Sequence, residues 1–299
     1  MPSDDRAALM HWRALTAARA RDPIARVPFM VLHGGQPHPA GSVSRAHVPA
    51  LRRWPQALRI DPERVTLTLP PAARTDFFTE ANRVLRDEGL IRAWRDETYP
   101  LHSLADGTLL ATVERAASRF WGSLTFGAHC NGYVAGADGR PVALWIARRS
   151  FSKPTDPGLL DNLIGGGVAH GQTPAEALVR EGWEEAGLSP AQMLGRLEAG
   201  HVVELARDIP EGFQREHLSV YDLALPDDVL PSNQDGEVAS LERLPIAEAL
   251  ALAATDAMTV DAGLVTLDFA LRRRLLPAAQ HDALLAAIGP LRRGPALLA

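Results

Sequence analysis

The sequence predicts an α/β (α+β) fold divided into two units. Apolar stretches closed by glycine or proline predict strands along the chain, and one helix with strong end signals lies between them. Further helices follow the last strand, an order typical of α/β or α+β domains. Charge differs between the units: residues 1–120 hold 17 Lys+Arg against 13 Asp+Glu, and residues 121–299 hold 14 against 23. We expect a smaller α+β domain over residues 1–120 and a second domain with C-terminal helices over residues 121–299.

The first unit opens with an amphipathic helix, predicted over residues 5–21. Residues 28–35, PFMVLHGG, form an apolar run closed by two glycines, and residues 65–71, VTLTLPP, alternate until two prolines, so both predict strands. Residues 75–90 predict a helix that a glycine ends. Another helix is expected over residues 111–122, at the end of the first unit or in the link to the second.

The second unit mixes strands with helices and leaves its last helices for the end of the chain. Its expected strands fall within 129–136, 141–150, 201–205, 218–225 and 235–244, and its expected helices cover 174–186, 246–255, 262–275 and 279–289.

Composition narrows the class of protein. The 299 residues are 46% hydrophobic and 22% charged, which is typical of a globular protein with a substantial core. Cys130 is the only cysteine, so no internal disulfide forms, and we expect its thiol in the core. No apolar run approaches the roughly 18 residues that cross a bilayer, and the first twenty residues lack a continuous apolar segment. No nucleic-acid recognition motif is present. These features predict a cytoplasmic protein with neither membrane nor nucleic acid as its partner.

The helix predicted over residues 174–186 has clear signals at both ends. Thr173 can act as N-cap, Pro174 fits the first helical position, and Glu176 completes a capping box. Gly187 is expected to end the helix. We expect Leu178, and with it Val179 and Trp183, to pack toward the domain.

Three glutamates share one face of this helix. Glu181, Glu184 and Glu185 fall at i, i+3 and i+4, with Arg180 beside them. A solvated acidic face is the ordinary interpretation of such a cluster. The preceding glycines, 165–167, let the backbone approach a ligand closely, and carboxylates with a nearby carbonyl suit Mg²⁺ or Mn²⁺. We therefore predict a divalent metal site.

The segment GGGVAHGQTPAEALVREGWEEAGL, residues 165–188, resembles the Nudix box, in which glycine, five residues, glutamate and seven residues precede Arg-Glu-U-x-Glu-Glu-x-Gly-U, with U aliphatic. Gly166 opens the match and Arg180 begins its charged part. Two positions depart: Gln172 stands for the first glutamate and Gly182 for the first aliphatic residue. The resemblance implies an α/β/α sandwich with a mixed sheet and hydrolysis of a small-molecule diphosphate.

Other segments resemble a Nudix subfamily that has an extra N-terminal domain and that in fungi is joined to thiamine pyrophosphokinase. The matching stretches are FGAHCNGYV (126–134), LWIARRSFSKPTDPGLLDNLIGGG (144–167), VYDLALP (220–226) and DGEV (235–238). This resemblance implies hydrolysis of thiamine diphosphate derivatives, particularly oxidised forms, to monophosphates.

The box resemblance also implies residue roles. Glu181, Glu184 and Glu185 would bind the metal, and Glu181 is a candidate base as well. The carbonyl near Gly166 would add a ligand, and Arg180 would orient the carboxylates through charge-assisted hydrogen bonds.

Residues outside the helix add candidates. Glu237 is expected as a further metal ligand or base, against the alternative of an acid in a turn. Arg148, Arg149 and Lys153 precede the box and are candidates for diphosphate binding, with surface solvation as the alternative. Lys153 is the only lysine among 31 basic residues.

Side chains of a probable strand and of the first unit complete the set. His129 and Asn131 alternate on the strand with Tyr133, so they face one way and can contact a substrate; a polar patch near the domain junction is the alternative. Arg95 and Glu97 lie in the first unit, which is expected to close over the substrate or to form part of a homodimer.

Two other functions stay open on the sequence alone. The box contacts the diphosphate, so a nucleoside diphosphate derivative such as ADP-ribose or NADH is an alternative substrate. A Nudix-fold ligand sensor without turnover is the second alternative, which the intact glutamates disfavour.

Overall fold

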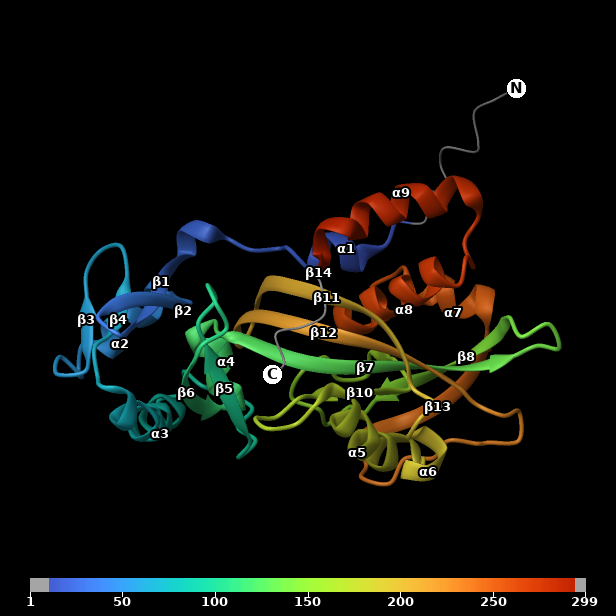
Figure 1. Cartoon of the computed structure of the whole chain (residues 1–299), viewed down its shortest axis with the longest axis horizontal. Coiled ribbons are helices and arrows are strands. Elements are labelled where there is room, and N and C mark those ends of the chain that lie inside the picture. Colours follow the sequence, from blue (N-terminus) through green and yellow to red (C-terminus); the bar gives the residue numbers. More distant parts are fainter. Residues whose placement is uncertain (1–10, 294–299) are drawn as a thin grey trace.

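The computed structural model describes residues 11–293 of the chain as two packed bodies (Figure 1). Fold class is as predicted, mixed α/β with a mixed sheet. The first body holds a four-stranded sheet in the order β2 (Gln36–Ser44), β1 (Arg26–His33), β4 (Val65–Leu67) and β3 (Leu58–Ile60). It also holds the helices α2 (Val48–Leu51), α3 (Pro71–Asp87) and α4 (Arg115–Trp121) and the hairpin β5 (Thr98–His102) and β6 (Leu109–Glu114), with two 3₁₀ turns at Pro23–Ala25 and Arg45–His47.

The second body is built on a larger sheet. Its strand order is β13 (Val238–Pro245), β8 (Pro141–Arg149), β7 (Leu124–Ala135), β12 (Gly212–Ala224), β11 (Glu198–Ile209) and β14 (Arg292–Arg293), with β10 (Ile164–Gly167) on β7 and β9 (Leu160–Asp161) on β8. Strands β7 and β12 run parallel, whereas their other neighbours are antiparallel.

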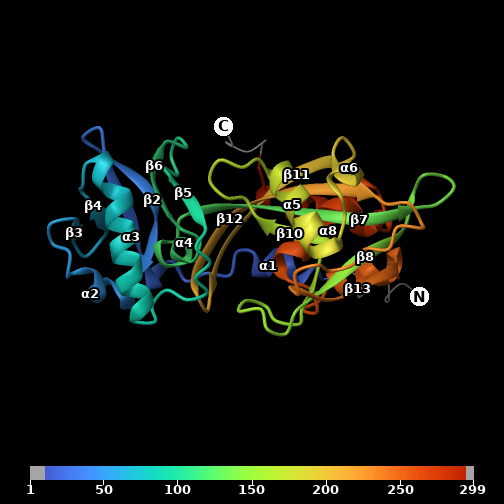
Figure 2. The same cartoon turned by 90° about the horizontal axis from the view of Figure 1, so that it is seen from below.

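Helices cover both faces of this sheet and form separate cores. Helices α5 (Pro174–Ala186) and α6 (Pro190–Met193) cover one face, as seen in Figure 2. Helices α7 (Ile246–Ala253), α8 (Val260–Arg272) and α9 (Ala278–Ile288) cover the other, and a 3₁₀ turn at Gly289–Leu291 follows them. The side chains of β7 alternate between the two cores, so Cys130 is buried on the α5 side and Tyr133 on the α8 side.

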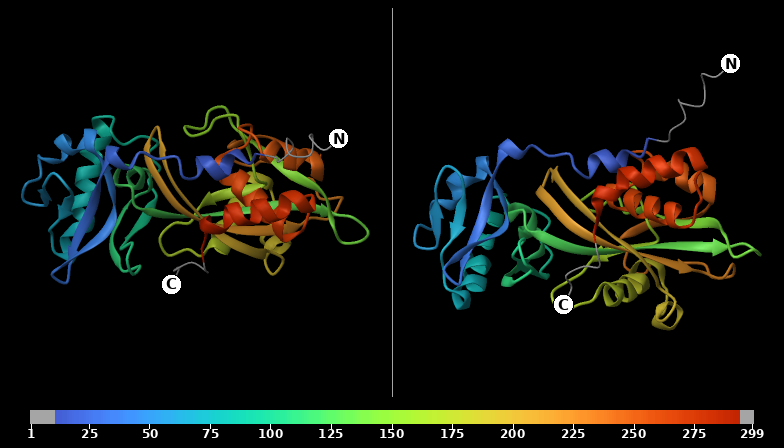
Figure 3. Two further views of the ribbon diagram at one scale, coloured as in Figure 1. Left: turned by 90° about the horizontal axis from the view of Figure 1, so that it is seen from above. Right: turned by 45° about the horizontal axis from the view of Figure 1, so that its top comes forward.

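The start of the described chain belongs to the second body. Helix α1 (Arg13–Ala17) packs on α8, and Trp12, Ala14 and Ala18 join its core (Figure 3). The backbone amide of Ala206 also donates to the Ala18 carbonyl at 2.9 Å. The first body's core instead runs from Val27 to Trp121. The predicted first unit is therefore not continuous in space, and part of the helix predicted over residues 5–21 lies outside the described residues.

One predicted helix was wrong in its first half. Residues 111–114 belong to β6, and the helix begins only at Arg115. The Glu114 carboxylate caps it by accepting from the amides of Ala116 and Ala117, and the apolar residues before it pair with β5. The sequence did not reveal where β6 ends and α4 begins, because the capping residue Glu114 follows directly on the apolar residues of the strand.

Among the described residues, no helix combines the length and the apolar character needed to cross a membrane.

Candidate active site

A cavity of about 250 Å³ lies where the two bodies meet. Its walls come from β10, α5, the loop after β8, the β11–β12 hairpin, the start of α8, and the first body. The lining residues include Arg95, Glu97, Arg115, Arg119, His129, Arg149, Lys153, Asp161, Gly165, Gly166, Gly167, Arg180, Glu181, Glu184, Glu216, Asp235, Glu237 and Asp261. Most candidates from the sequence therefore converge on one cavity.

Helix α5 forms as its end signals predict. Thr173 Oγ1 accepts from the Glu176 amide, Glu176 accepts in return from the Thr173 amide, and Gly187 ends the helix with φ 65°. Leu178 is buried, as expected, but Trp183 is 53% exposed, so its expected packing was wrong.

Each glycine of the box triplet lies against a side chain. A Cβ on Gly165 would meet the His129 ring at 2.7 Å, one on Gly166 would meet Glu181 Oε1 at 2.2 Å, and one on Gly167 would meet the Tyr99 hydroxyl at 1.6 Å. The triplet is thus required by packing: β10 passes between the sheet, the box helix and the first body, and a larger residue would displace one of them.

Two of the three helix glutamates are buried. Glu185 is 6% exposed and accepts from the Gly165 amide at 2.9 Å, and Glu181 is 9% exposed. Burial, reinforced by the Glu181 charge, raises the pKa of Glu185 well above its ordinary value. Burial also raises the pKa of Glu181, although Arg180 partly offsets this effect. A bound cation would relieve both carboxylates.

Arg180 bridges the box carboxylates. Its Nη2 donates to Glu181 Oε1 at 2.8 Å and its Nη1 donates to Glu184 Oε2 at 2.9 Å. The orienting role expected for Arg180 agrees with this geometry. Both hydrogen bonds of the Arg180 guanidinium within the described chain go to glutamates and not to Gln172, whose buried side-chain oxygen has no hydrogen-bond partner there.

The second departure from the box has a packing explanation. A Cβ on Gly182 would lie 2.3 Å from Met193 Sδ and 3.2 Å from Ile164 Cδ1. Helix α6 therefore packs where the family pattern places an aliphatic side chain.

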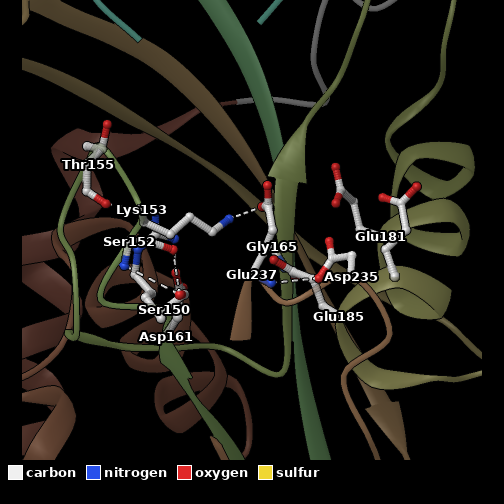
Figure 4. A network of polar contacts seen from close by, with 12 residues as sticks. Ser150, Ser152, Lys153, Thr155, Asp161, Gly165, Glu181, Glu185, Asp235 and Glu237 are labelled. Carbon is white, nitrogen blue, oxygen red and sulfur yellow. Dashed lines mark hydrogen bonds and ion pairs between the residues drawn. The ribbon is translucent and has the colours of Figure 1, made fainter. Parts of the chain in front are cut away.

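Glu237 faces the box from the opposite side of the cavity. Lys153 donates to its carboxylate, and Arg95 Nη1 reaches it at 3.4 Å. Figure 4 shows Lys153 extending from its loop toward Glu237, with Glu181, Glu185 and Asp235 nearby. Burial opposes ionisation of Glu237, but Lys153 and then Arg95 outweigh it and hold its pKa below the ordinary value.

Arg149 shapes the loop that carries Lys153. Its guanidinium donates to the carbonyls of Thr155 and Asp156 and, at 2.8 Å, to Asp161. His129 also lies at this site, donating from Nδ1 to Asn162 Oδ1 at 3.0 Å, with Asp161 Oδ1 3.6 Å away. The three hydrogen bonds of the Arg149 guanidinium therefore go to the protein itself, and they hold the loop that carries Lys153 in place.

The structure does not bring two predicted substrate-binding residues to the cavity. Arg148 donates to the Gly158 carbonyl at 2.9 Å on the other face of β8, because adjacent strand residues point in opposite directions. Asn131 is 2% exposed, and its amide donates to Asp222 beneath α8. It faces the same side as His129, as expected, but lies too deep in the core.

Several cavity residues were missed by sequence reasoning. Asp161, 7% exposed, could have been suspected as an acid inside the apolar run LLDNLI. Four other lining residues stand in no recognisable sequence motif, because only the docking of distant segments brings them to the cavity: Arg115, Arg119, Glu216 and Asp261.

The donor set fits a hard divalent cation. Carboxylates of Glu181 and Glu184 line the cavity with the Gly166 backbone, and Glu185 lies buried behind them, where it accepts from the Gly165 amide. Burial raises the pKa values of Glu181 and Glu185, although Arg180 donates to Glu181. In the described part of the chain, no three acidic, histidine or cysteine side chains already surround a single point, since Arg180 and Lys153 take carboxylate oxygens.

Comparison with known families agrees with this site. Residues 128–265 match the family model described as NUDIX domain, and residues 16–124 match the model described as Domain of unknown function (DUF4743).

Two curated proteins of Arabidopsis thaliana are similar over most of the chain. "Nudix hydrolase 20, chloroplastic" is 40% identical over 213 residues, which is 70% of this chain and 56% of that protein. "Nudix hydrolase 24, chloroplastic" is 37% identical over 207 residues, 69% of this chain and 56% of that protein. The chain thus spans about half the length of the curated relatives it matches.

Among solved structures, the DR0079 protein of Deinococcus radiodurans is 26% identical, with a TM-score of 0.43, over 58% of this chain and 99% of that one. By the family models, residues 128–265 are similar to the NUDIX domain and residues 16–124 to DUF4743, and the two plant relatives are named as Nudix hydrolases.

Proposed function

We propose that this protein is a Mg²⁺- or Mn²⁺-dependent hydrolase that cleaves the diphosphate of a small molecule. The observation that carries the proposal is the pair of buried carboxylates with raised pKa values: Glu181 lines a charged cavity, and Glu185 lies directly behind Gly165 of its lining. Such a pair is costly to a protein unless a cation completes it. The names of the two plant relatives support the reaction class.

The residues of the box would bind and orient the metal. Glu181, Glu184, Glu185 and the Gly166 carbonyl would hold the metal, which when bound neutralises phosphate charge and makes water a better nucleophile. Arg180 keeps Glu181 and Glu184 oriented.

A base is available on each side of the site. Glu181 has a raised pKa, which favours proton transfer near neutral pH, and it lies at the box wall. Glu237 faces it and, through its ion pairs, is held ionised with Lys153 and Arg95. These two cations would turn to phosphate oxygens when a substrate enters.

For the substrate we propose thiamine diphosphate derivatives, particularly oxidised forms, converted to monophosphate plus phosphate. The resemblance of four segments to the thiamine-linked subfamily supports this choice. So does the far wall, where Glu216 and Asp261 hold the Gln214 amide and would suit a cationic or hydrogen-bonding ring.

The test is hydrolysis with Mg²⁺ of thiamine diphosphate, its oxidised analogues, ADP-ribose and NADH, with Glu185→Gln as control. Chromatography follows the monophosphate products, because ADP-ribose and NADH would yield two phosphomonoesters and no free phosphate. Preferential, mutation-sensitive turnover of the thiamine compounds is expected. Preference for ADP-ribose or NADH would overturn the substrate and keep the reaction. No turnover of any compound, with metal and ligand still bound, would overturn the reaction in favour of a sensor.

A further inference from the structure

The two walls of the cavity carry opposite charge. The first body supplies four arginines and one glutamate to the lining: Arg92, Arg95, Arg115, Arg119 and Glu97. The second body supplies eight acids against four basic residues: Asp156, Asp161, Glu181, Glu184, Glu216, Asp235, Glu237 and Asp261 against Arg149, Lys153, Arg180 and Arg207. The acidic wall suits a metal, and the basic wall, net +3, suits the anion that accompanies it.

Helix α4 presents one face to this cavity. Arg115 and Arg119 are four residues apart, so they share that face, and Ala116 lines the cavity between them. Arg115 is held in place, because its Nη1 donates to both oxygens of Glu97, at 3.2 and 3.1 Å, and its guanidinium lies over the Tyr99 ring. The charge of Arg115 is thus partly balanced.

Arg119 differs from the other basic residues of the lining. Arg95 and Lys153 reach Glu237, Arg149 reaches Asp161, and Arg180 reaches two box glutamates. Arg92 and Arg207 each donate to one neutral oxygen. Arg119 is half-buried, yet the described residues give its guanidinium no hydrogen-bond acceptor and no carboxylate. A partly desolvated cation of this kind is stabilised when an anion binds beside it.

The backbone of Arg119 lies away from the box. Its backbone carbonyl packs on Gly212, where a Cβ would lie 2.4 Å from the oxygen. Gly212 begins β12, whereas Leu218 of the same strand pairs with Gly127, which in turn pairs with Gly167 of the box. Six strand residues span about 20 Å, so the side chain of Arg119 enters the shared cavity from the end remote from the box.

We propose that Arg119, supported by Arg115, is an anion-binding residue that the N-terminal domain contributes to the substrate site, and that its ligand is a phosphate group of the substrate. This inference rests on the proposed function for the identity of the ligand. For a thiamine diphosphate derivative this phosphate is the scissile diphosphate itself, and for a nucleotide substrate that carries a further phosphate it is that second group. In both cases the N-terminal domain takes part in selecting the substrate.

The test measures binding without turnover, in a Glu181→Gln background and without added metal, by calorimetry. The probes are inorganic pyrophosphate, NADH and NADPH, since NADPH differs from NADH by one added phosphate. Arg119→Ala is compared with Arg119→Lys, which keeps the charge, and with Arg59→Ala, the loss of an exposed arginine on β3 away from the cavity.

Arg119→Ala is expected to weaken binding of at least one probe by about tenfold or more, as the loss of a charge-assisted hydrogen bond does. Arg119→Lys should retain most of the affinity, and Arg59→Ala should retain all of it. Loss confined to NADPH identifies a second phosphate as the ligand, whereas equal loss for pyrophosphate identifies the diphosphate.

The inference is overturned if Arg119→Ala binds all three probes as its parent does. That result, together with a lower melting temperature, would assign Arg119 to the C-terminal dipole of α4 instead. Failure of the proposed function is separate, because it would appear as absent turnover in the wild-type protein while the effect of Arg119 on binding persisted.

Discussion

Two groups of buried acids in the same domain differ in whether arginines pair with their carboxylates. Under α8, Asp222 and Asp268 are fully buried, and arginines neutralise both: Arg272 donates to Asp222 at 2.7 and 2.9 Å and to Asp268 at 2.7 Å. Across the sheet, Glu185 is also buried, yet within residues 11–293 only a backbone amide hydrogen-bonds to it. Arg292 adds a second cation to Asp268, whereas nothing comparable reaches Glu185.

The pKa directions express this difference. Burial opposes ionisation of Asp268, but Arg272 and Arg292 outweigh it and lower its pKa. Burial and the Glu181 charge raise the pKa of Glu185. A carboxylate that the protein neutralises serves stability, and one that it leaves without a cation serves a ligand. The predictions below test that distinction.

The largest effect is expected at the box. Glu181→Gln should lower kcat/KM by about 10²- to 10⁴-fold, because the amide neither holds a metal nor accepts a proton. Unfolding by urea should show no loss of stability, since the change removes a buried charge with a raised pKa. A loss of stability as large as that of Asp268→Asn would contradict the distinction.

Asp268→Asn should have the reverse profile. Arg272 and Arg292 would lose their buried partner, which costs about 3–5 kcal/mol of unfolding free energy. Activity per folded molecule should remain, because Asp268 does not line the cavity. The measurement pairs urea unfolding with kcat/KM on the same sample.

The stability contributed by Asp268 should depend on pH. Because its folded pKa lies below the ordinary 3.8, this contribution is complete above pH 3.8 and is lost as the pH falls through the folded pKa. The stability gap between the wild-type protein and Asp268→Asn should therefore be constant at about pH 5 and above and narrow in stronger acid. A gap that widened on acidification would have the wrong sign.

A smaller effect tests the junction between the domains. Gly167→Ala places a methyl group against the Tyr99 hydroxyl, and overpacking of this kind costs about 1–3 kcal/mol. Adding Tyr99→Phe removes the clashing oxygen and should restore part of the loss. Thermal unfolding of the single and double variants gives the comparison, and additive losses would show that the two residues do not meet.

The two groups of acids also differ in how far the sequence predicts them. Helix α5 and its caps were predictable because Thr173, Glu176 and Gly187 act locally. The register of the box glutamates was predictable for the same reason. Asp222 and Asp268 were not, since their partners depend on how α8 packs on β12.

Candidate residues failed where a strand face decided the outcome. Arg148 and Asn131 lie on predicted strands, but the sequence does not say which face meets the cavity. Arg119 was invisible because its position depends on contact between two domains. Local chemistry thus predicted the acidic wall of the cavity, and the docked domain supplies the other wall.

The central claim is that the box carboxylates are held for a divalent cation, and metal-dependent thermal unfolding tests it most directly. At saturating Mg²⁺ or Mn²⁺ the melting temperature of the wild-type protein should rise, and binding at 100 times Kd corresponds to about 2.7 kcal/mol. Glu185→Gln should melt higher than the wild type without metal and gain little from it, whereas Asp268→Asn should gain as much as the wild type. Equal gains in the wild type and Glu185→Gln, or none in the wild type, would contradict the account.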